Sequence, residues 1–141
     1  QMTPDLVDPL EALQRAQVAA LKSDTTLQGL HSSGVEIFDR VSSDSFPYIV
    51  VGEDREVPND SECQTMSEVF STVRIYSRAF GKVEAKRIAG RTRFVLDAVN
   101  GFAIEGFRII AAHCTDVKIH SHTDGQTTQA ELTFRYLVEP G

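Results

Sequence analysis

The sequence predicts an α+β fold, in which helices pack on a mainly antiparallel sheet. Three observations support this class: capped helical segments at the start, several segments with strand-like alternation, and one further helical segment among the strands. Consecutive strands joined by short turns favour antiparallel pairing with helices packed on the sheet. The 141 residues suffice for a single domain spanning residues 1–141, in which we expect residues 1–7 to be flexible.

The opening segment, DPLEALQRAQVAALKSD, predicts the first helix. Asp8 can cap it, Pro9 suits its first turn, and Glu11 lies near the positive end of the helix dipole. Asp24 can cap a second short helical turn, which ends at Gly29 or at the Ser-Gly pair that follows.

Two strands are expected after these helices. Residues 35–41, VEIFDRV, predict a brief strand, and residues 48–57, YIVVGEDREV, predict a strand buried at Ile49–Val51. Pro47 belongs at the beginning of the second strand because it has no amide hydrogen to donate.

The polar stretch NDSECQTMSEV is compatible either with a long loop or with the flared end of a hairpin. From Val69 onward, residues alternate between two faces, which predicts a long strand. One face carries Val69, Ser71, Val73 and Ile75, and the other carries Phe70, Thr72, Arg74, Tyr76 and Arg78.

Residues 80–101, FGKVEAKRIAGRTRFVLDAVNG, change to a helical period, and Gly101 is expected to cap this helix. Its core side is predicted to carry Val83, Ile88, Thr92, Val95, Leu96 and Val99, and its other side Lys82, Lys86, Arg87, Arg91 and Arg93.

Two last strands, GFRIIAAHCTDVKIH and QAELTFRYLVE, are separated by an Asp-Gly turn signal. The final strand alternates, with Ala130, Leu132, Phe134, Tyr136 and Val138 predicted to face inward.

Composition excludes several classes of function. A net charge of −6 argues against a protein that grips phosphates. No apolar run approaches the roughly 20 residues of a membrane helix, and no signal-peptide pattern opens the chain, so we expect a soluble protein without a membrane partner.

Phosphate-binding, dinucleotide-binding and hydrolase motifs are absent, so we expect no cofactor, no catalytic residues and no enzymatic activity. Cys63 and Cys114 are expected to be reduced, with one bridge between them as the alternative.

The acids Glu53 and Asp54 follow a buried strand. Adjacent strand residues point to opposite faces, so a shared-proton catalytic pair is disfavoured, and a solvated acidic strand end is the prediction. Lys86, Arg87 and Arg91 form part of a basic helix face, which is either solvated or meets an acidic partner. These two patches could complement each other in a head-to-tail ring, which makes all five residues candidates for a subunit interface.

The region from His113 to His122 offers an alternative function. His120 and His122 would project from one strand face, with His113 or Cys114 nearby, as in a metal-binding module or a small enzyme. A closed set of four ligands is not visible in the sequence.

Several segments together resemble the tail-completion, or tail-terminator, proteins of long-tailed bacteriophages and of phage-like gene transfer agents. ALQRAQVAALKSDTTLQGL resembles the family's leading helix, and IFDRVSSDSFPYIVVGED its strand, turn and Pro-Tyr strand. IYSRAFGKVEAKRIAGRTRFVLD is similar to its strand running into a helix, and SHTDGQTTQAELTFRYLVE to its closing hairpin.

The resemblance implies a structural protein of the virion tail, present in the bacterial cytoplasm during assembly. It implies a hexameric ring on the head-proximal end of the tail tube, which ends tube growth and joins tail to head. The implied partners are other copies of the chain, the major tail tube protein and a head-tail connector or stopper protein. DNA would pass through the ring without sequence-specific binding, and no metal, cofactor or catalytic residue is implied.

Overall fold

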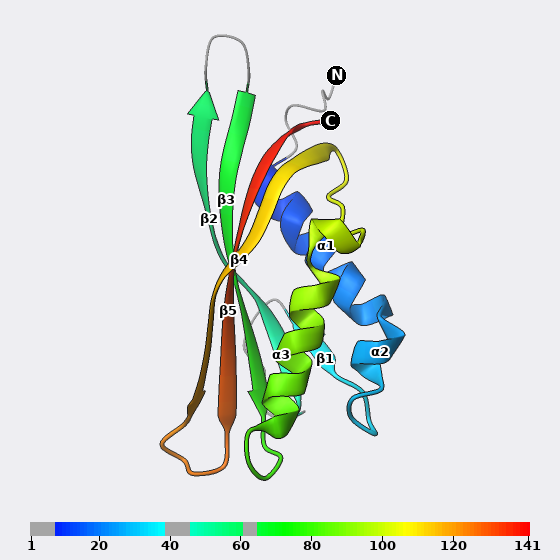
Figure 1. The fold of residues 1–141 in the computed structure, drawn as a ribbon, viewed down its shortest axis with the longest axis vertical. Helices are drawn as coiled ribbons and strands as arrows, with labels where there is room; N and C mark the ends of the chain where they lie inside the picture. The colour runs from blue at the N-terminus through cyan, green and yellow to red at the C-terminus, as the bar shows by residue number, and fades with distance from the viewer. Residues whose placement is uncertain (1–7, 39–45, 61–64) are drawn as a thin grey trace.

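The computed structural model describes residues 8–38, 46–60 and 65–141 of the chain (Figure 1). The expectation that residues 1–7 are flexible therefore falls outside the described residues. The order of elements matches the predicted order of two helices, three strands, a helix and two strands. The elements are α1 (Pro9–Ser23), α2 (Thr25–Gln28), β1 (Glu36–Phe38), β2 (Tyr48–Asp60), β3 (Thr65–Ser77), α3 (Val83–Val95), the 3-10 turn η2 (Ala98–Asn100), β4 (Phe107–Ser121) and β5 (Thr128–Pro140).

In the described ranges the strands form a five-stranded sheet with the order β1-β2-β3-β5-β4. β2, β3, β5 and β4 pair antiparallel with their neighbours, whereas β1 pairs parallel to β2, with Ile37 opposite Ile49. β5 lies between β3 and β4, so α3 carries the chain across the sheet from β3 to its far edge. The predicted α+β class with a mainly antiparallel sheet is confirmed.

The helices lie on one side of the sheet and the core lies between them and the sheet (Figure 1). α1 packs on β2 and β1, and α3 packs on β5 and β3. The face of β5 predicted to point inward is buried, from Ala130 to Val138 at alternate positions. In β3, the buried face is the one that carries Val69, Ser71, Val73 and Ile75. Ile49 and Val51 of β2 and Leu13 and Leu21 of α1 complete this core.

Local side-chain chemistry begins and ends the helices as predicted, except in α3. Asp8 accepts a hydrogen bond from the Leu10 amide at 3.0 Å, Asp24 accepts one from Leu27 at 2.9 Å, and Gly29 ends α2.

α3 stops at Val95 rather than continuing to Gly101. Asp97 accepts a hydrogen bond from the Val99 amide at 2.9 Å and starts η2, and Gly101 then adopts a φ of 98°. Val83, at the first position of α3, is 57% exposed and Val99 is 90% exposed, so both were wrongly assigned to the core side. The change from α to 3-10 geometry alters the rotation per residue, which accounts for Val99. Val83 precedes that change, but it lies five residues before the buried Ile88, and at 3.6 residues per turn this spacing places the two on different sides of the helix.

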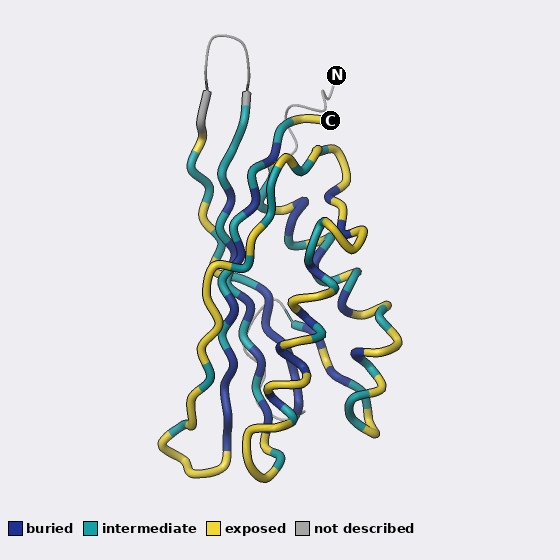
Figure 2. Tube along the Cα trace, in the orientation of Figure 1, coloured by how far each residue is buried: buried dark blue, intermediate teal, exposed yellow. Residues whose placement is uncertain are grey.

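β2 and β3 form a long hairpin that extends past the helices (Figure 1). Backbone pairing continues to Asp60 opposite Thr65, so the hairpin interpretation of the polar stretch is confirmed in its described part and the long loop is excluded there. Figure 2 shows that buried residues concentrate where the helices cover the sheet, whereas the far part of this hairpin is mainly intermediate or exposed. The hairpin therefore projects from the core.

Candidate interaction surfaces

Glu53 and Asp54 lie inside β2, not at an exposed end of it as predicted. Between Gly52 and Arg55, β2 has one residue more than β3, since Gly52 pairs with Thr72 and Arg55 with Phe70. Glu53 has a φ of 62°, in the left-handed region. Such a bulge accommodates the extra residue, so the strand continues beyond it. The Gly-Glu-Asp sequence that forms the bulge was interpreted as the end of the strand.

Glu53 has a partner within its own chain. Arg74 Nη2 donates to Glu53 Oε1 at 2.7 Å, and Arg74 Nε lies 3.8 Å from Glu131 Oε1. The Glu53 carboxylate is the main reason that the pKa of Arg74 is raised above its ordinary value. The Glu53 side chain is 69% exposed, so this pair contributes little to stability, but it neutralises part of the predicted acidic patch.

Asp54 is partly buried rather than solvated. Within the described residues its Oδ1 atom is shielded from solvent and has no hydrogen-bond partner. Burial raises the pKa of Asp54, and the hydroxyl of the nearby Ser71 opposes that rise only in part. The ionised Asp54 carboxylate therefore destabilises the folded state, and it is not freely available to contact a second subunit.

Replacing Asp54 with asparagine is expected to raise the free energy of unfolding at pH 7 by about 1 kcal/mol, because asparagine removes a poorly solvated charge. The raised pKa means that folded Asp54 binds a proton more tightly than unfolded Asp54. The destabilising effect of the ionised Asp54 carboxylate should therefore diminish as pH falls through the folded pKa toward the ordinary value of 3.8. Urea unfolding at several pH values measures this, with Glu53→Gln as the exposed control. A less stable Asp54→Asn variant at pH 7 would contradict the expectation.

Several buried positions carry polar side chains. Gln17, Ser71 and Thr92 are fully buried, and the Ser71 hydroxyl donates to Gln17 Oε1 at 3.2 Å. In the described part of the chain, Gln17 Nε2 and Thr92 Oγ1 lack hydrogen-bond partners. A catalytic group must reach its substrate, and these fully buried groups have no such access, so we assign them to the core.

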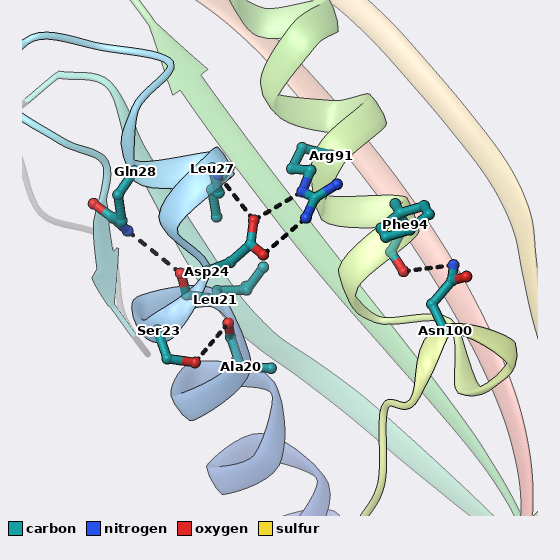
Figure 3. A network of polar contacts seen from close by, with 9 residues as sticks. All are labelled: Ala20, Leu21, Ser23, Asp24, Leu27, Gln28, Arg91, Phe94 and Asn100. Carbon is teal, nitrogen blue, oxygen red and sulfur yellow. Dashed lines mark hydrogen bonds and ion pairs between the residues drawn. The ribbon is translucent and has the colours of Figure 1, made fainter.

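The three basic residues predicted to act together on α3 have different environments. Lys86 and Arg87 are exposed. Arg91 instead donates to both carboxylate oxygens of Asp24, at 2.8 and 3.0 Å, and its guanidinium lies 4.6 Å from the ring centre of Phe94 (Figure 3). The Arg91 hydrogen bond is the main reason that the pKa of Asp24 is lowered. Arg91 thus ties α3 to the start of α2.

The histidine region does not gather into a ligand set. His122 Nε2 lies 2.6 Å from Gln129 Oε1, and the His122 ring stacks on His120 with centroids 5.7 Å apart. Across residues 8–38, 46–60 and 65–141, no group of three or more His, Cys, Asp or Glu side chains is placed to hold a metal ion. No observation in these ranges favours the alternative metal site.

Cys114 is a poor candidate for a nucleophile. It pairs with Phe134 on the core-facing side of β5, while His113 pairs with Arg135 on the opposite face. Burial raises the pKa of the Cys114 thiol, which disfavours the reactive thiolate. By the strand register, the neighbouring His113 therefore points away from this thiol.

One end of the molecule is a tip made of the β3–α3 loop and the β4–β5 turn, which are joined by hydrogen bonds. Arg78 Nε donates to Thr127 Oγ1 at 3.1 Å, and Thr128 Oγ1 donates to the Gly81 carbonyl at 3.4 Å. Asp124 accepts from the Thr127 amide and hydroxyl, which lower its pKa to about 2. Phe80 projects from this tip and is fully exposed, a feature that the sequence interpretation missed.

These observations define a class: a small α+β protein whose described surface carries exposed charged side chains and the fully exposed Phe80. The model of the family "Tail completion protein gp17" matches residues 15–139. The chain belongs to this family and is therefore a structural component of a virion tail. The predicted resemblance is confirmed.

Two solved structures share the fold. A chain from the virion of a native gene transfer agent particle aligns with a TM-score of 0.79 at 19% identity, covering 93% of this chain and 97% of that chain. The gp17 protein of bacteriophage SPP1 aligns with a TM-score of 0.63 at 22% identity, covering 96% of this chain and 95% of that chain. A search of curated proteins found no match. Among the described residues no helix is long and apolar enough to cross a membrane.

Proposed function

We propose that the protein forms a hexameric ring at the head-proximal end of the tail tube, where it terminates tube growth and joins the tail to the head connector or stopper protein. The observation that carries this proposal is the family match, which extends over residues 15–139. The similarity in fold to a chain of a gene transfer agent particle over nearly its whole length supports it.

The shape of the subunit suits a protein that joins two different neighbours. The β2–β3 hairpin projects from one end of the long axis, and the tip that carries Phe80 lies at the other (Figure 1). A ring of such subunits would present different chemistry on its two rims. We assign one rim to the tail tube protein and the other to the connector.

The charge of the chain suits a ring through which DNA passes. Proteins that hold DNA do so with clustered basic residues that displace counterions. A chain with a net charge of −6 has little tendency to retain DNA, so the DNA can move through the ring without sequence-specific binding.

The set of residues that the sequence predicted for the subunit interface needs revision. Glu53, Asp54, Lys86, Arg87 and Arg91 were the predicted participants, but Glu53 and Arg91 have partners within the chain and Asp54 is half-buried. Lys86 and Arg87 remain exposed and are the members of this set best placed to meet a neighbour.

Loss of this protein is expected to leave DNA-filled heads unattached and tail tubes of abnormal, mostly excessive length, because nothing caps the growing tube. Electron microscopy of particles from a producing strain that lacks the gene measures both effects. Expression of the wild-type chain should restore normal particles, and Glu105→Gln, at an exposed position, should restore them equally. Heads joined to tails of normal length without the protein would overturn the proposal.

A further inference from the structure

The tip made of the β3–α3 loop and the β4–β5 turn carries apolar side chains that the subunit leaves uncovered. Phe80 is fully exposed, and Val83, at the first position of α3, is 57% exposed. The loop that carries Phe80 is nevertheless held in place, since Thr128 Oγ1 donates to the carbonyl of Gly81. An exposed aromatic side chain on a held loop adds nothing to the core, and it suits an anchor in a contact with another protein.

A hollow of about 340 Å³ opens beside Phe80, between the two loops of the tip. Arg78 and Lys82 line it, together with the hydroxyl of Ser121 and the amide of Gln126, and none of the described residues that line it is acidic. All four of these side chains can donate hydrogen bonds, whereas an ionised carboxylate only accepts them. The hollow therefore suits a carboxylate from outside the subunit.

The acidic side chains near the hollow are already engaged. Asp124 accepts hydrogen bonds within its own turn and lies 3.7 Å from Arg78, and Glu84 accepts one from the Ser77 hydroxyl at 2.6 Å. Lys82 is exposed and forms no ion pair with any described residue. It also precedes α3 at the end where the helix dipole disfavours a cation. Helix stability thus does not explain Lys82, and the charge left available at the tip is positive.

A second copy of the chain is a poor partner for the tip. The apolar groove between α1 and β1 is bordered by Lys22 and by Glu11, whose carboxylate Arg15 already pairs. Such a border opposes the approach of Lys82. In the proposed ring the tip lies at one end of the long axis of the subunit, and therefore on a rim, where a different protein stands (Figure 1).

We propose that the tip is the docking surface for a protein other than this chain, one that offers an apolar pocket to Phe80 and a carboxylate to the hollow beside Lys82. This proposal rests on the ring of the proposed function and gives the chemistry of the partner on one of its rims. Duplex DNA is also attracted to cations, but phosphate binding makes no use of Phe80 or Val83. An apolar anchor beside a cationic hollow fits an acidic protein segment.

Heads and tail tubes, purified separately from a producing strain that lacks the gene, are the probes that test the proposal. Co-sedimentation measures the binding of the purified protein to each. The wild-type chain is expected to bind both. Phe80→Ser is expected to bind one of the two preparations about tenfold more weakly and the other as the wild type does, because the far end of the subunit is unchanged.

Val99→Ser is the matched control, because Val99 is 90% exposed and lies in η2, beyond the other end of α3. This variant should bind both preparations as the wild type does. The melting temperatures of Phe80→Ser and Val99→Ser should stay within about 2 °C of the wild type, because neither side chain is packed. Light scattering should show the same oligomeric state for all three proteins.

Variants of Lys82 test the hollow. Lys82→Glu should weaken binding about tenfold to the same preparation that Phe80→Ser affects, because it places a carboxylate against the carboxylate of the partner. Lys82→Arg keeps the charge and should retain binding. Lys22→Glu, an equal change of charge at the end of α1, should leave binding to both preparations unchanged.

Wild-type binding of Phe80→Ser to both preparations would overturn the proposal. An equal loss on heads and tubes, a loss of self-association, or binding of a short DNA duplex that depends on Phe80 and Lys82 would also overturn it. In each of these cases the wild-type chain still binds heads and tubes, so the proposed function stands. A wild-type chain that binds neither preparation would reject the proposed function, and this docking surface with it.

Discussion

Replacement of Tyr136 by alanine is expected to lower the free energy of unfolding by about 4 kcal/mol, the largest effect predicted for a single side chain of this protein. Tyr136 is fully buried in β5, and its ring centre lies 5.6 Å from that of Phe102. Its hydroxyl donates to the Leu96 carbonyl at 2.9 Å, just beyond the end of α3. The substitution therefore leaves a cavity and an unsatisfied carbonyl at the point where α3 meets the sheet. Urea unfolding followed by circular dichroism measures the loss.

Tyr136→Phe is the matched control, since it keeps the ring and removes only the hydroxyl. We expect it to cost about 1 kcal/mol, the value of one buried hydrogen bond. Equal losses for the two variants would show that the hydrogen bond, and not the packing of the ring, dominates at this position.

Asp24→Ala is expected to have the second largest effect, about 2 kcal/mol. One carboxylate caps α2 through the Leu27 amide and accepts both hydrogen bonds from Arg91 (Figure 3). Alanine removes the cap, which by itself costs about 1 kcal/mol, and also removes the tie to α3. Asp24→Asn retains an acceptor for the cap and loses the charge, so it should be less destabilising. Urea unfolding of both variants at neutral pH gives the comparison.

The two Asp24 variants should also differ from the wild type in pH dependence. Arg91 lowers the folded pKa of Asp24 below its ordinary value of 3.8. The stabilisation is therefore complete above pH 3.8 and is lost as pH falls through the lowered folded pKa. The deficit of Asp24→Ala should shrink in that acid range, and a deficit that is independent of pH would contradict a contribution from the ion pair.

The predicted elements that proved accurate depend on local signals. Asp8 and Asp24 cap helices through amides two and three residues away, and Gly29 ends α2. The alternation in β5 places Ala130 to Val138 in the core because successive strand residues face opposite sides. Both kinds of signal act over a few residues, so they can be seen in the sequence without knowledge of the rest of the fold.

The candidate interface was predicted less accurately because its partners are distant in the chain. Arg91 binds Asp24, 67 residues earlier, and Glu53 binds Arg74 across a strand pair. The number and signs of the charges were evident from the sequence, but which charges remain available to a second molecule was not. Phe80 was overlooked for a related reason: an aromatic residue before a helix is ordinarily expected to contribute to a core.

By itself, the sequence determined the class of fold, the order of the elements, the inward face of β5 and the family, because these follow from periodicity, capping and the succession of segments. Only the tertiary structure decided that β1 pairs parallel to β2, that β5 separates β3 from β4, and that a bulge holds Asp54 partly out of solvent. Strand pairing and burial are set by contacts between residues far apart in the chain, and the free energy of such contacts depends on the whole packed structure rather than on any local pattern.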